Sequence, residues 1–185
     1  MEGQSLEKLK LEIQQKAKMG VDFIISGGIL WLAIFIIWFQ DLPYYNKSIF
    51  TFIIASLMLP LAFGCSKILK TNWKIKNNPL QPLGLWLNFA QLVYFPILVF
   101  TLIKYPEHFI MVYAIITGAH LFPYAWMYEG NGYAVAAILI SVGSMAIALL
   151  LASNSFWLIP LFTSMGLFIL AIWIFTRLKK LTNEK

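Results

Sequence analysis

Long apolar stretches separated by short polar connections run through most of this chain. Six of them are each about twenty residues long, which is the length an α-helix needs to cross the hydrocarbon core of a bilayer. They are residues 21–40, 48–68, 82–103, 108–128, 132–152 and 155–176. Only Ser153 and Asn154 separate the last two, but together these exceed one crossing, so two helices joined by a turn are expected.

A shorter amphipathic pattern precedes the first window. Leu6, Leu9, Ile13 and Ala17 recur at spacings of three and four residues, with charged residues on the other faces. The pattern predicts a helix that lies along the inner headgroups of the membrane, with a partner-binding helix as the alternative. Acidic residues, beginning with Glu2, interrupt any basic leader, and no cleavage site follows the first apolar window. We therefore expect the first span to stay in the mature protein.

Basic residues lie beside three of the polar segments. They precede the first window, separate the second from the third, and follow the sixth. The three clusters are Lys8, Lys10, Lys16 and Lys18, then Lys67, Lys70, Lys74 and Lys76, then Arg177, Lys179, Lys180 and Lys185. Six spans place all three clusters on one side, and the opposite loops hold only Lys47 and Lys104. Since short basic loops stay in the cytoplasm, both termini are expected there.

These features predict an all-α polytopic membrane protein. We expect a cytoplasmic amphipathic helix in residues 1–20, a bundle of six transmembrane helices in residues 21–177, and a cytoplasmic tail in residues 178–185. The predicted location is the cell membrane, with the chain crossing it several times.

Composition supports the membrane interpretation and excludes a soluble globule. Of 185 residues, 60% are hydrophobic and only 12% are charged, and the mean hydropathy is +0.75. The net charge is +6, and the basic residues responsible lie beside the apolar windows. This position favours anionic lipid headgroups over nucleic acid as the partner. The single cysteine, Cys65, permits neither an intrachain disulfide nor a Cys-x-x-Cys motif.

Polar side chains inside the third and fourth windows are the candidates for a ligand-binding site. A polar group buried without a partner costs on the order of 2–7 kcal/mol, so each one requires a partner or a function. Within each window these residues share one helical face. They are Asn88 and Gln91 in the third window and Tyr113, Thr117, His120 and Tyr124 in the fourth.

Asn88, Gln91 and His120 are expected at similar depths in the membrane. With about 1.5 Å per residue, Asn88 and Gln91 lie roughly 9–14 Å, and His120 roughly 12 Å, from the cytoplasmic ends of their spans. We therefore predict a polar pocket in the cytoplasmic half of the membrane that binds or transports a small or amphipathic molecule. The alternative is that these groups only hydrogen-bond across helices and hold the bundle together.

Three further polar residues near the same side are candidate rim residues. They are Asp22, Ser26 and Glu129. Asp22 also has a purely structural interpretation, because Lys18 lies four residues earlier and can form an ion pair with it. Glu129 borders a glycine-rich turn, and its alternative interpretation is a solvent-exposed carboxylate without a role in the site.

Catalysis is a weaker interpretation of these residues. His108 and His120 are roughly 18 Å apart along one helix and cannot share a metal ion. The sequence contains no His-Glu-x-x-His motif and no paired carboxylates inside a span. No catalytic residue, metal site or cofactor is predicted. An intramembrane enzyme acting on a lipid or isoprenoid, with His120 as acid or base, stays as an alternative, as does a structural or regulatory subunit without a ligand.

Small side chains form a stripe along the fifth window. They are Ala137, Ser141, Ser144, Ala148 and Ala152. Small residues let helix backbones approach closely. We expect this helix to pack in the centre of the bundle or to form the contact of a homo-oligomer.

Short motifs in the fourth window and in two loops carry a family resemblance. They are Val112-Tyr113-Ala114, Gly118-Ala119-His120-Leu121, Pro123, Tyr124 and Trp126, with Asp41-Leu42-Pro43 and Asn78-Pro79-Leu80. Together they resemble a family of small bacterial multi-pass membrane proteins of unknown function. The likeness covers most of the chain. It implies a bacterial inner membrane and brings no known activity or ligand.

Overall fold

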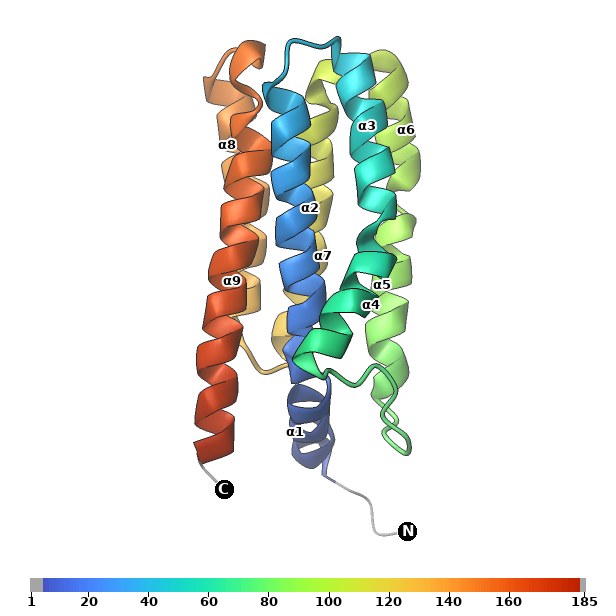
Figure 1. The fold of residues 1–185 in the computed structure, drawn as a ribbon, viewed down its shortest axis with the longest axis vertical. Helices are drawn as coiled ribbons and strands as arrows, with labels where there is room; N and C mark the ends of the chain where they lie inside the picture. Colours follow the sequence, from blue (N-terminus) through green and yellow to red (C-terminus); the bar gives the residue numbers. More distant parts are fainter. Residues whose placement is uncertain (1–4, 184–185) are drawn as a thin grey trace.

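The computed structural model describes residues 5–183, which are helical apart from short connections (Figure 1). Glu2 and Lys185, which entered the sequence-based predictions, lie outside the described residues. The elements are α1 (Leu6–Lys16), η1 (Lys18–Gly20), α2 (Val21–Phe39), α3 (Tyr44–Ser56), α4 (Met58–Leu69), α5 (Gln81–Leu92), α6 (Phe95–Lys104), η2 (Pro106–His108), α7 (Phe109–Met127), α8 (Asn131–Leu150), η3 (Ser153–Ser155) and α9 (Leu158–Asn183).

Six helical segments of the described chain are long and apolar enough to cross a membrane. They are Lys18–Phe39, Tyr44–Leu69, Gln81–Lys104, Pro106–Met127, Asn131–Leu150 and Ser153–Leu181. Each overlaps one of the apolar windows, so the predicted number of spans is confirmed at the level of length and composition. The chain is an all-helical protein with six candidate membrane spans.

Two of these spans are divided into consecutive helices. α3 gives way to α4 around Leu57, and α5 gives way to α6 around Val93 and Tyr94. Pro60 lies in the first turn of α4 and Pro96 in the first turn of α6. Backbone N–H groups in a first turn have no acceptor within their own helix, so a proline there costs no helical hydrogen bond. Pro123, in contrast, lies inside α7, which continues through it.

The hydrophobic core lies mainly between α2, α7, α8 and α9. α2 packs against α9 and α4, and α7 packs against α8. Trp31 and Ile34 of α2, Phe109 of α7, Ile140 of α8 and Ile174 of α9 are among its buried side chains. α5 has no buried residue and packs chiefly on α7, so α5 and α6 form one edge of the bundle (Figure 1).

The two ends of the bundle differ in what they carry. We call the end with the connections 70–80 and 128–130 and both ends of the described chain the terminal end. The opposite end, with the connections 40–43, 105–108 and 151–157, is called the distal end (Figure 1).

α1 packs against the terminal end of the bundle. Ile13 and Gln14 are each 2% exposed, whereas Leu6, which belongs to the predicted apolar stripe, is 49% exposed. The Asn78 side chain donates to the carbonyl oxygen of Leu9 at 2.9 Å and to Oε2 of Glu12 at 2.8 Å. The buried face of α1 is therefore held by polar contacts as well as by apolar packing.

Lys10 attaches the same helix to the end of α7. Its Nζ lies 3.4 Å from Oε1 of Glu129 and 3.8 Å from the centre of the Trp126 ring. A cation over an indole face is attracted by the ring electrons, and burial strengthens that attraction. α1 is thus part of the folded bundle and fixes the position of Glu129.

Candidate functional site

Near the terminal end, one backbone carbonyl oxygen of α5 accepts hydrogen bonds from side chains of both α5 and α7. The Tyr124 hydroxyl of α7 donates to the Gly84 oxygen of α5 at 3.3 Å. Nδ2 of Asn88 donates to the same oxygen at 2.8 Å. Two predicted site residues from different helices are therefore brought to one acceptor.

This contact also fixes which residues of the two helices lie at the same level. α5 and α7 run in opposite directions, so four residues onward from Gly84 corresponds to four residues back from Tyr124. Asn88 therefore lies level with His120. By the same reckoning Gln91 lies level with Thr117.

His120 has an aromatic neighbour but no hydrogen-bond partner. Its ring meets the Tyr124 ring edge to face, with 5.3 Å between the ring centroids. The side chain is half-buried. Within the described residues, no hydrogen bond reaches either of its ring nitrogens, although an imidazole both donates and accepts.

Asn88 and Gln91 also keep unused hydrogen-bonding capacity. Asn88 is exposed, and its one side-chain bond goes to a carbonyl of its own helix. Its amide oxygen accepts no hydrogen bond from the residues that the structure describes. Gln91 is half-buried and makes no side-chain hydrogen bond within the described chain. Neither amide bridges two helices.

The distal part of the predicted stripe on α7 faces a different neighbour. The Tyr113 ring stacks on Trp31 of α2, with 5.0 Å between the ring centroids. The Thr117 hydroxyl donates to the Tyr113 carbonyl oxygen at 2.9 Å, within its own helix. One face of α7 thus meets α5 near the terminal end and α2 farther along, so the six candidates do not form one cluster.

Asp22, a candidate rim residue, is a buried carboxylate at the start of α2. It is 1% exposed and accepts hydrogen bonds on Oδ2 from the Thr71 hydroxyl at 2.7 Å and from Nε1 of Trp73 at 2.6 Å. The alternative ion pair with Lys18 is not formed, because Nζ of Lys18 donates to the Leu69 carbonyl oxygen at 2.6 Å. Asp22 therefore fastens the connection 70–80 to the bundle.

The other two rim candidates also make local contacts. The buried Ser26 hydroxyl donates to the Asp22 carbonyl oxygen at 2.7 Å, within α2. Glu129 is exposed, has a left-handed backbone with φ of 48°, and pairs with Lys10. The polar groups of both residues therefore already have partners in the fold.

Two tyrosines that the sequence analysis did not select extend the site toward the terminal end. The rings of Tyr124, Tyr128 and Tyr133 lie within 6.0 Å of one another, centroid to centroid. The Tyr133 hydroxyl donates to the Met19 carbonyl oxygen. Burial, reinforced by the nearby Tyr124 and Asp22, raises the pKa of the Tyr128 phenol far above its usual value, so this group stays neutral.

Sequence spacing could have found one of these tyrosines. Tyr128 follows Tyr124 by four residues and continues the same helical face. Tyr133 belongs to the next helix, and only the packing of α8 on α7 brings it there. Across the described residues, no group of three or more His, Cys, Asp or Glu side chains is placed to hold a metal ion.

Comparison with known proteins identifies a family over nearly the whole chain. A family model described as "Family of unknown function (DUF7010)" matches residues 6–177. No curated protein and no solved structure matches the chain. The resemblance to a family of unknown function is confirmed to that extent.

Proposed function

The chain belongs to the DUF7010 family, whose function is unknown, and from the arrangement of α5 and α7 we propose that it binds or transports a small or amphipathic molecule. The proposed site comprises Asn88, Gln91, His120 and Tyr124. One observation carries the proposal: within candidate membrane spans, Asn88, Gln91 and His120 hold hydrogen-bonding capacity that no described residue uses. In hydrocarbon such groups are costly unless a ligand or water satisfies them.

The chemistry of these groups favours a neutral polar group on an amphipathic ligand. Amides and imidazole donate and accept, and no charged side chain lies among them. Exposed apolar side chains of α5, including Trp86 at 68% and Phe89 at 48%, flank Asn88 in the sequence. They offer the apolar contact that an acyl or isoprenoid chain requires. Tyr113, stacked on Trp31 of α2, and Thr117, bonded within α7, are not part of this proposed site.

The proposed orientation places the terminal end in the cytoplasm of a bacterial cell. The described basic clusters lie at the terminal end, whereas Lys47 and Lys104 lie toward the distal end. Basic segments are retained on the cytoplasmic side of inner membranes. With this orientation α1 lies at the inner headgroups, where membrane lipids are its partners, and the site between α5 and α7 lies in the inner half of the bilayer.

Native mass spectrometry of protein purified gently from its own membrane tests the binding site. We compare wild type with Asn88→Ala and His120→Ala, using Asn131→Ala and His108→Ala as matched controls outside the site. We expect a discrete additional mass on wild type and both controls that is lost from the two site variants. If all five proteins carry the same lipids, the binding proposal is wrong.

Thermal unfolding separates ligand binding from a structural role. Asn88 is exposed and bonds only within α5, so Asn88→Ala should change the free energy of unfolding by no more than about 0.5 kcal/mol. Loss of the bound mass without loss of stability supports a binding site. A loss of several kcal/mol would instead show that the amide holds the bundle together.

A further inference from the structure

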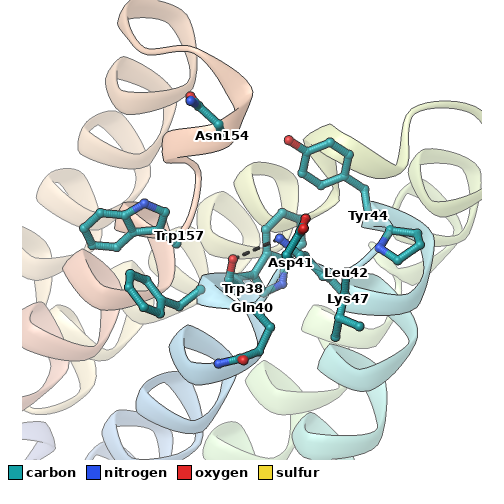
Figure 2. A pocket seen from close by; sticks show the side chains of 10 residues that line it. Trp38, Gln40, Asp41, Leu42, Tyr44, Lys47, Asn154 and Trp157 are labelled. Carbon is teal, nitrogen blue, oxygen red and sulfur yellow. Dashed lines mark hydrogen bonds between the residues drawn. The ribbon is translucent and has the colours of Figure 1, made fainter.

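A second polar region opens at the distal end, away from α5 and the His120 side chain. A recess of about 530 Å³ lies between the end of α2, the connection 40–43 and the segment around η3 (Figure 2). Its lining includes Trp38, Asp41, Tyr44, Lys47, Asn154 and Trp157. The recess therefore combines aromatic walls with one cation and one carboxylate.

Lys47 is a buried cation with spare donors. It is 8% exposed, and its Nζ donates to the Trp38 carbonyl oxygen at 3.1 Å (Figure 2). The Tyr44 and Trp38 ring centres lie 5.4 and 5.8 Å from the same nitrogen. An ammonium has three N–H donors, so two remain without a hydrogen bond among the described residues.

The fold satisfies only part of the Lys47 ammonium group. Its hydrogen bond to the Trp38 carbonyl oxygen places Nζ at the carboxyl-terminal end of α2, where the helix dipole favours a positive charge. Burial of the side chain removes part of its hydration. A bound anion would offset that cost, because it would supply acceptors for the two N–H groups without a described partner and a compensating charge.

Asp41 provides the opposite charge without neutralising Lys47. It is exposed and close enough to interact electrostatically with the ammonium. However, the described side chains include no ion pair between the two. An ammonium group on a ligand could therefore be held between this carboxylate and the aromatic rings, since cations bind the faces of Trp and Tyr.

We propose that this recess binds a zwitterionic group with a phosphate and an ammonium, supplied by the headgroup of a membrane phospholipid. The phosphate lies at Lys47 and the ammonium at Asp41. A lipid is favoured as the source because the recess lies where candidate spans end, next to the 61% exposed Phe39. This site is at the opposite end of the bundle from Asn88 and does not depend on the function proposed above.

Lipid titration of the purified, delipidated full-length protein tests the inference. Native mass spectrometry compares phosphatidylethanolamine with phosphatidylglycerol of the same acyl chains, because the second lipid has no ammonium. Wild type is compared with Lys47→Met and Asp41→Asn. Lys104→Met is the matched control, since it removes an exposed lysine that does not line the recess.

We expect wild type and Lys104→Met to bind the zwitterionic lipid more tightly than the anionic one. Lys47→Met should weaken binding of the zwitterionic lipid by about tenfold or more, the effect of losing a charge-assisted hydrogen bond. Asp41→Asn should abolish the preference between the two lipids. Because Asp41 is exposed, that variant tests the proposal even if Lys47→Met does not fold.

Two results would overturn the inference. One is equal binding of both lipids by wild type. The other is unchanged affinity for the zwitterionic lipid in a folded Lys47→Met, or an unchanged preference between the two lipids in Asp41→Asn. A further arm uses free phosphoethanolamine as competitor: failure to displace the lipid at equal concentration supports a lipid source, and displacement at that concentration overturns it.

Discussion

At the scale of single residues, Asp22 shows how this fold accommodates a buried carboxylate that forms no ion pair with any described residue. Its Oδ2 accepts from a hydroxyl and an indole N–H of the connection 70–80. It also lies in the first turn of α2, where the helix dipole favours a negative charge. Lys18, which the sequence offered as the partner, bonds to a carbonyl oxygen. Removing one donor should therefore be costly.

Thr71→Val should lower the free energy of unfolding by about 1–3 kcal/mol, because the buried carboxylate loses one of its two donors. The matched control is Thr176→Val, whose exposed hydroxyl bonds only within α9 and should change stability by less than about 0.5 kcal/mol. Thermal unfolding in detergent measures both. Equal effects of the two substitutions would show that Asp22 does not depend on Thr71.

Glu12 links charge to the docking of α1. Hydrogen bonds from Lys16 and then Asn78 lower the pKa of Glu12 below its usual value near 4.5. A carboxyl group whose pKa is lowered by folding stabilises the folded state above the unfolded value, and that contribution is lost as the pH falls through the folded value.

We expect the unfolding midpoint of wild type to fall more steeply than that of Glu12→Gln when the pH is lowered below about 4.5. The variant lacks the titrating carboxyl group, so this part of the pH dependence disappears. Glu7→Gln is the control, because Glu7 is exposed on the same helix. Parallel curves for wild type and Glu12→Gln would contradict the docking role of Glu12.

At the scale of elements, the small residues of α8 explain its close approach to α7. Ala137 and Ser144 are 2% and 0% exposed, and the Ser141 hydroxyl donates to the Ile115 carbonyl oxygen at 3.2 Å. A Cβ atom on Gly118 would lie 2.5 Å from Oγ of Ser141 and 2.9 Å from its backbone nitrogen. Ala137, Ser141 and Ser144 of the predicted small-residue stripe therefore pack against other parts of the same chain.

Gly118→Ala should destabilise the protein by about 1–3 kcal/mol, because the added methyl group forces two helix backbones apart. Gly64→Ala is the matched control, since a Cβ at that helical position meets nothing within 4 Å. The control should be neutral or stabilising by up to about 1 kcal/mol. Comparable thermal midpoints for the two variants would show that α7 and α8 can separate freely.

At the scale of the whole molecule, the alternation of six spans places both ends of the described chain at one end of the bundle (Figure 1). The recess with Lys47 lies at the other end. If the basic clusters face the cytoplasm, the two proposed sites lie in different halves of the membrane. Orientation therefore decides which compartment each site faces.

Labelling of single cysteines tests the orientation. In a Cys65→Ser background, Ser153→Cys at the distal end should react with an impermeant maleimide in intact bacterial cells. Asn72→Cys at the terminal end should react only after permeabilisation, because basic loops are retained inside. Both positions are exposed in the structure, and the parent without cysteine is the control. The reverse pattern would contradict cytoplasmic termini.

The sequence by itself determined the number of candidate spans and the faces that carry polar groups. Both depend on local properties: an apolar length that matches the bilayer, and the 3.6-residue periodicity that places His120 beside Tyr124 and Asn88 beside Gln91. The second and third candidate spans are each divided into two helices, and the only sequence features near these breaks are Pro60 and Pro96, which lie just after them.

Only the tertiary structure decided which helices meet and which polar groups find partners. Asp22 is bound by residues 49 and 51 positions away, and Tyr124 reaches Gly84 across 40 positions. In the sequence, Lys47 is simply one of two basic residues in the loops opposite the basic clusters. Only the fold shows that it is buried and bonded to the Trp38 carbonyl oxygen. Helix pairing in hydrocarbon depends on many small packing and hydrogen-bond differences between distant segments, and these are not encoded in any one window.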